Sequence, residues 1–544
     1  MGVRVRLVLL TTAGNQGFIF ASNRLREAVG ASELVREATT AWVEEACASV
    51  TSTSDSGRAV VLQASSGRAL VVTDGLEAAN EVVWKVTHAG MARAPGLDLF
   101  GTSIAIQGTL PTSQEISEVF AAASRLQARR PSPAARFQRL PVVAACSSTD
   151  LPAAVWHSDV RADPSGLPVS GEEPAPMSAE VVAKRGARPA ADRRMRGLLG
   201  ETFRLVDIDE FFDAVDWVAV VHADGNGLGG LFQRAPDILE NPAEVAKLSS
   251  RVQSSADTAF RTAAAMVPAR RLPGGSVREA VPLVPLVVGG DDLTALVDAA
   301  AALPFVRAYL EEFGRVSAAD ELVRRVNDGR GLTAAAGIAV VKPHFPFSTA
   351  YELAEELCRN AKDARSEIPG TVSVHAVDVH VLFDSVVSSL DALRARFEVP
   401  AVPGVRGPLA LHERPFFLPT DGADMPGPWR HRTLAEVVAR AGAVRGRAAG
   451  RADGVLVTRS QLHALREELH GDADRAERRF ADLWRRAVEA GGADDRDVLE
   501  KLAGGSGDPP RLIRQLGGDE QRCSTSIVDA LELADLIEGA ERRR

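Results

Sequence analysis

Two adjacent acidic residues follow a glycine pair in the middle of the chain: Asp291 and Asp292 come directly after Gly289 and Gly290. The flanking residues within 285–297 are mostly Val and Leu, which favours a β-hairpin, and the glycines permit positive φ and close approach of backbone or phosphate. Two carboxylates at one turn repel each other unless a cation lies between them. A solvated surface turn is the alternative, but such turns seldom join two long apolar segments. We therefore interpret this segment as a metal-binding hairpin.

A third acid, Asp224, ends an apolar segment that begins at residue 216, and glycines follow it, as expected for a strand that leads into a tight turn. Residues 332–341 are small and branched and predict another strand. Residues 350–362 place Ala and Leu side chains on one helical face, with Lys362 at the edge of that face. The order is strand with acid, helices, hairpin with acids, helix, strand and helix with lysine. This order is typical of a palm-type nucleotidyltransferase or cyclase.

A competing interpretation of residues 225–230 is a dinucleotide-binding glycine motif, whose spacing they satisfy after a strand. We reject it because a Rossmann unit needs a second strand with an acid about twenty residues further on, whereas residues 236–265 read as mostly helical. Asp224 would also place a negative charge against the pyrophosphate, unless a metal ion lay between them. The chain contains no Gly-x-x-x-x-Gly-Lys-Ser/Thr motif, so a Walker-type ATPase has no support.

The amino-terminal third has the pattern of a second copy of the same unit. Residues 5–10 predict a strand, a helix begins at residue 24, and residues 59–72 predict a hairpin. The tip of this hairpin is Ser65-Ser66-Gly67, so hydroxyls stand where a metal site needs carboxylates. We expect this copy to bind no cation. This copy either forms one wall of a nucleotide pocket or serves as scaffold, and we weigh the two alternatives equally.

The ordered set of motifs resembles the palm domains of the large subunit of type III CRISPR effector complexes of the Csm and Cmr type. The residues that carry the resemblance are Asp224-Gly225-Asn226-Gly227-Leu228-Gly229, Gly289-Gly290-Asp291-Asp292 and Ala361-Lys362. GGDEF diguanylate cyclases are similar to a lesser degree. The implied fold is α+β, with two ferredoxin-like palm domains and a helical C-terminal domain. The boundaries that we expect are 1–145 for a degenerate first palm, 146–205 for a linker with a remnant of a zinc module, 206–390 for the active second palm and 391–544 for the helical domain.

The resemblance also implies roles for individual residues. Asp224, Asp291 and Asp292 would be catalytic and, with the carbonyl of Gly225, would bind two Mg²⁺ or Mn²⁺ ions. The residues expected to bind the nucleotide are Gly225, Asn226, Gly289, Gly290 and Lys362. Asn226 replaces an acid often found in the family, which weakens charge compensation at the metals. His222 would share a strand face with Asp224, either in support of the metal ligands or as a structural histidine.

The implied reaction joins ATP into cyclic oligoadenylates in antiviral defence. Two other hypotheses stay open: an architectural subunit that binds nucleotide without turnover, and a GTP-using cyclase of the GGDEF kind. Other CRISPR effector subunits and guide or target RNA are the expected partners besides the nucleoside triphosphate. The chain begins at the first palm-like unit without a His-Asp pair there, so we expect no HD nuclease. Only Cys146 stands where many relatives have four zinc-binding cysteines, so we expect no zinc.

Length and composition agree with this interpretation. A chain of 544 residues exceeds what one hydrophobic core supports, and a net charge of −9 gives no indication of a broad nucleic-acid-binding surface. The four cysteines are widely scattered, which excludes a disulfide framework and fits a reducing cytoplasm. No apolar segment is long enough to span a membrane, so we predict a cytoplasmic protein without membrane contact.

Overall fold

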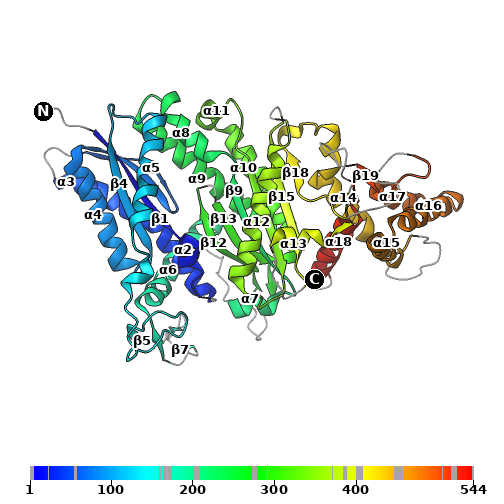
Figure 1. Cartoon of the computed structure of the whole chain (residues 1–544), viewed down its shortest axis with the longest axis horizontal. Helices are drawn as coiled ribbons and strands as arrows, with labels where there is room; N and C mark the ends of the chain where they lie inside the picture. Colours follow the sequence, from blue (N-terminus) through cyan, green and yellow to red (C-terminus); the bar gives the residue numbers. More distant parts are fainter. Residues whose placement is uncertain are drawn as a thin grey trace.

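The computed structural model is elongated, with the amino-terminal unit at one end, a central sheet and a helical carboxy-terminal unit at the other end (Figure 1). The structure describes residues 5–22, 24–53, 58–157, 161–162, 168–169, 174–200, 208–271, 279–290, 292–369, 372–383, 389–399, 408–445, 457–504, 507–515 and 523–541. Among these residues no helix is both long enough and apolar enough to cross a lipid bilayer.

The amino-terminal unit is an antiparallel sheet with helices packed against it. The strands β1 (Val5–Ala13), β2 (Ala59–Ser65), β3 (Arg68–Asp74) and β4 (Asp98–Ala105) lie in the order β2-β3-β1-β4. The central strand β1 pairs with β3 and β4, and its residues Leu7, Val8, Leu9 and Leu10 are buried. The helices of this unit are α1 (Asn15–Ile19), α2 (Leu25–Thr39), α3 (Ala41–Thr53), α4 (Gly75–Arg93) and α5 (Ser113–Arg129), and η1 (Pro133–Arg136) is a 3₁₀ turn.

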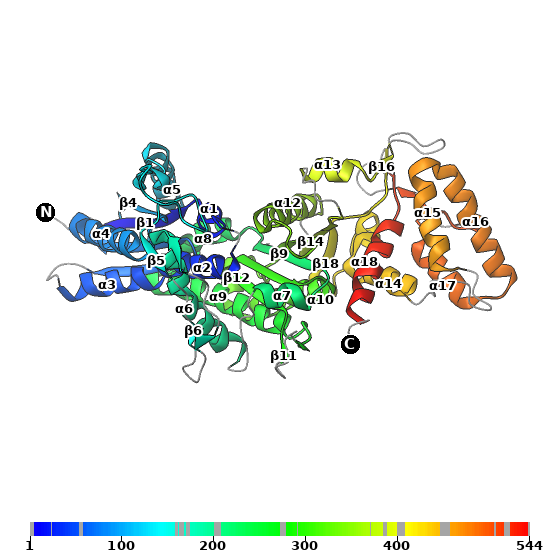
Figure 2. The ribbon, with the colours of Figure 1, turned by 90° about the horizontal axis from the view of Figure 1, so that it is seen from below.

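The central unit is built on a six-stranded sheet. Its strands β9 (Val218–Gly225), β12 (Leu283–Gly289), β13 (Asp292–Asp298), β14 (Ala334–Val341), β15 (Val374–Val381) and β18 (Phe416–Pro419) lie in the order β12-β13-β9-β14-β15-β18. The helices are α7 (Ile208–Ala214), α8 (Leu228–Ile238), α9 (Pro242–Ala264), α10 (Ala299–Ala319), α11 (Glu321–Val326), α12 (Phe347–Ser366) and α13 (Leu390–Ala395). Figure 2 shows α12 on one face of this sheet and α9 and α10 on the other. Strands covered on both faces are apolar throughout, as the sequence of β14 is.

The two sheets share one topology. The order β12-β13-β9-β14 in the central unit repeats the order β2-β3-β1-β4 of the amino-terminal unit, and these strand pairs are antiparallel in both units. This repetition, together with the helical carboxy-terminal unit, confirms the predicted α+β class with two palm domains.

The position of α12 depends on Gly337 in β14. A Cβ atom at Gly337 would lie 2.0 Å from the carbonyl oxygen of Ala354, so only a residue without a side chain allows the helix to pack this closely. Because α12 carries Lys362, this contact also fixes the height of the lysine above the sheet.

The segment 146–205, predicted as a linker, contains the 21-residue helix α6 (Ala179–Leu199). This helix packs against α2 at Gly30, where a Cβ atom would lie 1.7 Å from the carbonyl oxygen of Lys184. This helix at residues 179–199 was not predicted within the expected inter-palm linker. Short strands precede the helix: β5 (Val155–His157), β6 (Arg161–Ala162), β7 (Pro168–Val169) and β8 (Ala175–Met177), while β10 (Arg270–Arg271) and β11 (Glu279–Ala280) form a separate pair later in the chain.

The carboxy-terminal unit is mainly helical, but the predicted boundary at residue 390 is wrong, because β18 pairs with β15 in the palm sheet. The helices are α14 (Leu434–Arg445), α15 (Arg459–Gly471), α16 (Ala473–Glu489), α17 (Ala493–Leu502) and α18 (Ile527–Glu541). They pack with a small sheet of β16 (Glu398–Val399), β17 (Leu409–Ala410), β19 (Arg514–Gln515) and β20 (Cys523–Ser524), and the 3₁₀ turns are η2 (Thr420–Gly422) and η3 (Gly427–Arg432).

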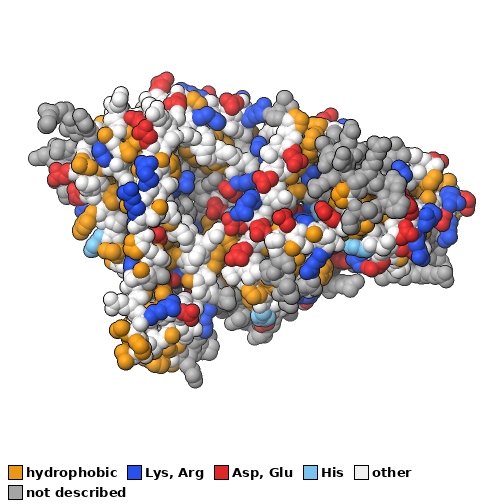
Figure 3. All heavy atoms as spheres, in the orientation of Figure 1, with side chains coloured by type: hydrophobic (Ala, Val, Ile, Leu, Met, Phe, Trp, Pro, Cys, Tyr) orange, Lys and Arg blue, Asp and Glu red, His pale blue; other side chains and the backbone are white. Residues whose placement is uncertain are grey.

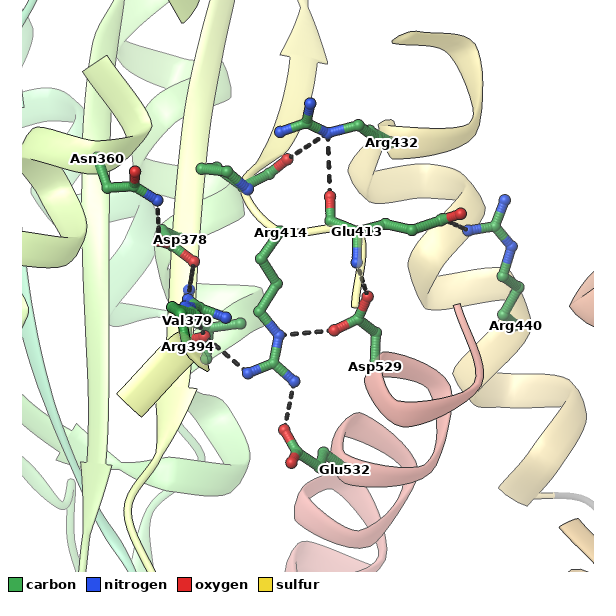
Figure 4. A network of polar contacts seen from close by, with 11 residues as sticks. Asn360, Asp378, Val379, Arg394, Glu413, Arg414, Arg432, Arg440, Asp529 and Glu532 are labelled. Atoms are coloured by element: carbon green, nitrogen blue, oxygen red, sulfur yellow. Dashed lines mark hydrogen bonds and ion pairs between the residues drawn. The ribbon is translucent and has the colours of Figure 1, made fainter. Parts of the chain in front are cut away.

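A buried network of charged side chains joins the palm sheet to this helical unit (Figure 4). Arg414 donates to Asp529 at 2.6 Å, contacts Glu532, and donates to the carbonyl oxygen of Val379 in β15 at 3.0 Å. On the palm side, Arg394 contacts Asp378 at 2.5 Å. Arg414, Asp378 and Asp529 are buried, so this network is a fixed connection between the two units.

Candidate active site

Asp224 and Asp292 lie at the same end of two neighbouring strands. Leu293 of β13 pairs with Ala223 of β9, so the next residue of each strand, Asp292 and Asp224, lies at the edge of the sheet beside the other. Side chains alternate between the two faces of a sheet, and paired residues share a face. Both acids therefore point to the face that α12 covers. The structure thus brings together two of the three predicted acids, while Asp291 lies outside the described residues.

The carboxylate of Asp292 has one buried oxygen without a hydrogen-bond partner, Oδ1. Nδ1 of His222 lies 3.5 Å from this oxygen, and 46% of the Asp292 side chain is exposed. Burial of Oδ1, together with the charge of Asp224, raises the pKa of Asp292 to about 7. A proton or a cation would satisfy this oxygen.

Lys362 reaches the acids from α12. Its ammonium contacts the carboxylate of Asp224 and lies 3.3 Å from the carbonyl oxygen of Gly225. Both side chains are partly exposed, at 29% for Lys362 and 38% for Asp224, so the pair is open to solvent and to a ligand. The lysine therefore lies where it can bind either the acid or a phosphate group.

The glycine turn of the β12-β13 hairpin touches the hairpin of the first palm. Gly290 has a φ of +66°, and its amide donates to Oε1 of Gln253 at 2.5 Å. A Cβ atom at Gly290 would lie 3.5 Å from the Cβ of Ser65, and one at Gly289 would lie 3.6 Å from the Cβ of Ser66. The two hairpin tips therefore face each other across the interface between the palms.

Asn226 makes hydrogen bonds within the protein, and its nucleotide binding stays a prediction. Its side-chain amide donates to the hydroxyl of Thr333 at 3.0 Å, and its backbone amide donates to the carbonyl oxygen of Thr333 at 2.8 Å. These bonds hold the turn after β9 against the start of β14. Asn226 also lines a separate small cavity of about 220 Å³ with Arg330 and Arg365.

A cavity of about 480 Å³ lies between the two palms and reaches both glycine motifs, at Gly229 and Gly290. Ligand pockets for small molecules commonly have volumes of about 300–1,000 Å³. Its side chains combine aromatic rings with amides and one cation: Gln63, Arg68, Phe120, Phe232, Gln233 and Gln253. The guanidinium of Arg68 lies 4.9 Å from the ring centre of Phe120. This mixture suits a flat, polar-edged ring such as a nucleobase.

The site residues fit a divalent cation of the Mg²⁺ type by their chemistry. Asp224, Asp292 and the carbonyl of Gly225 are all oxygen donors, and the buried Oδ1 of Asp292 has no hydrogen-bond partner. Within the part of the chain that the structure describes, no three His, Cys, Asp or Glu side chains come close enough to hold a metal ion by themselves. The metal-binding role of these residues therefore remains a prediction.

Several residues around the acids were missed in the sequence. Tyr351 and Glu355 of α12 lie near Asp292. The charge of Glu355 raises the pKa of Asp292, and the charge of Asp292 raises the pKa of Tyr351. Figure 3 shows acidic and basic side chains gathered over the centre of the molecule, where α12 lies. Gln16 and Arg68 come from the first palm. The sequence does not indicate a role for these two residues, because they reach the site only where the two palms pack against each other.

The strands, the convergent acids and the lysine-bearing helix define a palm domain of the nucleotide cyclase and polymerase type. Residues 217–368 match the family model of the Cas10/Cmr2 second palm domain. The match confirms, for this segment, the resemblance to the large subunit of type III CRISPR effector complexes. No curated protein sequence matches the chain.

Solved structures give more distant likenesses. A Csm1–Csm4 cassette in complex with pppApA has 13% identity and a TM-score of 0.47, over 98% of this chain and 70% of that chain. The apo Csm1–Csm4 cassette has 14% identity and a TM-score of 0.40, over 66% and 53%. Csm1 from T. onnurineus has 12% identity and a TM-score of 0.41, over 91% and 65%. The chain thus spans between about half and seven tenths of these relatives.

Proposed function

We propose that this chain is a metal-dependent nucleotidyltransferase that joins ATP into oligoadenylates, with cyclic products, in prokaryotic antiviral defence. The observation that supports this most directly is the convergence of Asp224, Asp292 and Lys362 at one edge of a Cas10/Cmr2-type palm sheet. A cavity of about 480 Å³ reaches the same glycine motifs and has room for a nucleoside. This reaction requires acids that bind cations, a lysine that binds phosphates and a pocket that binds a base.

In the proposed reaction, the oxygen of a 3′-hydroxyl forms a bond to the α-phosphorus of ATP, the bond to the bridging oxygen breaks, and pyrophosphate leaves while the hydroxyl proton passes to solvent. Two Mg²⁺ or Mn²⁺ ions held by Asp224, Asp291, Asp292 and the carbonyl of Gly225 would supply activation of the hydroxyl and charge stabilisation. Lys362 would exchange its contact with Asp224 for the triphosphate, whose charge it neutralises. Gly289 and Gly290 leave space for the nucleotide beside the hairpin.

The assignment of ATP rests on the family and on the character of the cavity. Gln63, Gln233 and Gln253 each carry an amide that donates and accepts, which suits the polar edge of a purine, and two phenylalanines provide stacking surfaces. We further propose that the chain works with other CRISPR effector subunits and guide or target RNA, since the matched palm belongs to the large subunit of such complexes.

The test is incubation of the purified protein with Mg²⁺ or Mn²⁺ and radiolabelled ATP or GTP, followed by product separation. Linear or cyclic adenylates would support the proposal. Formation of cyclic di-GMP from GTP would identify GTP rather than ATP as the substrate, as in the GGDEF cyclases. Retained nucleotide binding without any product, also in the presence of the assembled complex and target RNA, would overturn the enzymatic proposal and favour an architectural role.

A further inference from the structure

The hairpin that carries Asp292 is held from outside its own sheet. Its first strand, β12, is the outermost strand of the palm sheet, and backbone groups on such an edge need partners from elsewhere. Nη1 of Arg194 in α6 donates to the carbonyl oxygen of Val288 in β12 at 3.1 Å. This bond fixes the strand directly before the glycine pair of the turn.

A second side chain holds the turn itself. Gly290 is the first residue of the turn between the paired residues Gly289 and Asp292. The hydrogen bond of such a turn joins its first and last residues, so the amide of Gly290 needs another partner. It donates to Oε1 of Gln253 in α9 at 2.5 Å. Nε2 of Gln253 donates in turn to Oδ1 of Asp257, one turn further along α9, at 2.8 Å. Asp257 therefore keeps the oxygen of the Gln253 amide directed at the turn.

The bond from Arg194 depends on the first palm. Nε of Arg194 donates to Oε2 of Glu33 in α2 at 3.0 Å, and Glu33 also pairs with Arg36 at 2.7 Å. The side chain of Glu33 is 2% exposed and that of Arg194 is 24% exposed. A buried carboxylate that accepts from two guanidinium groups has a fixed orientation. Glu33 therefore sets the position at which Arg194 meets β12.

Both side chains approach the hairpin from the side of α9. Arg194, Gln253 and Val288 line a cavity of about 690 Å³ together with other residues of α9. Asp224 and Asp292 point instead to the face that α12 covers, and Figure 2 shows α9 and α12 on opposite faces of the sheet. Neither bond therefore occupies the side on which a metal ion would lie.

We propose that Arg194 and Gln253 are positioning residues that hold the hairpin turn in the geometry for metal binding. Each bonds a backbone group no more than four positions before Asp292. The loss of groups that orient metal ligands typically weakens metal binding about 10- to 100-fold. Through Glu33 and Arg194, the first palm, whose own hairpin tip has no acids, thus contributes to the metal site of the second palm.

The proposal rests on the proposed metal-binding function, so the test measures Mn²⁺ binding to the full chain, without nucleotide and without turnover. Electron paramagnetic resonance titrations compare the unaltered protein with Gln253→Met and Arg194→Met, in which the new side chain forms neither hydrogen bond. The matched control is Arg196→Met, the same change at an exposed position of the same helix. Thermal unfolding is measured for every variant, because Arg194 also pairs with the buried Glu33.

A double variant, Gln253→Glu with Asp257→Asn, tests whether hydrogen bonding is the cause. It exchanges the donor and the acceptor of the bond between positions 253 and 257. The new carboxylate at position 253 still accepts from the amide of Gly290, and the new amide at position 257 donates to that carboxylate. The double variant should therefore bind Mn²⁺ within about twofold of the unaltered protein, because the bond to the turn is kept.

We expect about 10-fold weaker Mn²⁺ binding in Gln253→Met and in Arg194→Met, and unchanged binding in Arg196→Met. The loss of a positive charge by itself favours a bound cation, so weaker binding in Arg194→Met would report lost geometry rather than lost charge. The Gln253 variants leave the ion pair of Arg194 with Glu33 intact, so they decide the question even if Arg194→Met unfolds at a lower temperature.

Three outcomes would contradict the proposal. Equal affinity in Gln253→Met, Arg194→Met and the unaltered protein would overturn the positioning role while leaving the metal site intact. Equal weakening in Gln253→Met and in the double variant would also overturn that role, because the bond to Gly290 would then not be the cause. Absence of saturable Mn²⁺ binding in the unaltered protein would overturn the proposed metal site and the positioning role with it.

Discussion

The ammonium group of Lys362 contacts the carboxylate of Asp224, although the two residues are 138 positions apart in the sequence. The contact joins the end of β9 to the last turns of α12, and the carbonyl oxygen of Gly225 lies beside it. A cation at Asp224 and a phosphate at Lys362 would each compete with this pair. Nucleotide and metal are therefore expected to bind together more readily than either binds alone. A metal ion at Asp224 releases Lys362 for the phosphate, and a phosphate at Lys362 releases Asp224 for the metal ion.

Replacement of Asp292 by Asn should reduce nucleotide product formation by about 100-fold or more, because the amide cannot provide the negative charge that a bound cation requires. ATP binding in the absence of metal should change by less than about threefold, since Asp292 does not line the cavity between the palms. Product assays and equilibrium dialysis with labelled ATP measure the two effects. Full activity of Asp292→Asn would show that this carboxylate is not part of the reaction centre.

Replacement of Lys362 by Met should raise the KM for ATP by about 10-fold, because a charged contact to the triphosphate is lost. Steady-state kinetics at fixed Mg²⁺ measure this effect. Arg307→Met is a suitable control, since Arg307 is 48% exposed and pairs with the exposed Glu311 on the surface of α10. If both variants had the KM of the unaltered protein, the assigned contact between Lys362 and the triphosphate would be wrong.

Two buried histidines in β15 predict loss of stability in mild acid. Burial lowers the pKa of His375 and of His380 from 6.5 to about 3, so both are neutral in the folded protein. The unfolded chain takes up protons at about pH 6.5, so the stabilisation is complete above that pH and is lost as the pH falls toward 3. Within this window each histidine should lower the free energy of unfolding by about 1.4 kcal/mol per pH unit.

Urea denaturation at pH 7, 6 and 5 tests this dependence. His380→Asn should reduce the slope, because one proton-binding group is gone, while His375 and His412, whose pKa values burial also lowers, still contribute. The same slope in His380→Asn and in the unaltered protein would assign the pH dependence to other groups.

The network between the palm sheet and the carboxy-terminal helices predicts a large effect for Arg414→Met. The substitution leaves Asp529 and Glu532 buried without their cation, which should lower the free energy of unfolding by about 3–5 kcal/mol. The exposed pair of Arg485 with Asp482 provides the comparison, and Arg485→Met should change stability by less than about 1 kcal/mol. Similar denaturation midpoints for the two variants would contradict a stabilising role of the buried network.

The sequence predicted those parts of the site that depend on local pattern. Asp224 follows an apolar strand and Asp292 follows a glycine turn, and antiparallel pairing brings such strand ends together. The contact of Tyr351 with Phe20 of the first palm could not be predicted, because it forms only when two palms distant in sequence pack against each other. The boundary at residue 390 was wrong because β18 has four residues between irregular segments, which is too short to show strand alternation.

The contact between the two hairpin tips has a practical consequence for labelling this protein. A short serine and glycine turn such as Ser65-Ser66-Gly67 is ordinarily an attractive place to insert an epitope or a fluorescent reporter. Here Ser65 and Ser66 lie against Gly290 and Gly289, so an insertion would force the palms apart.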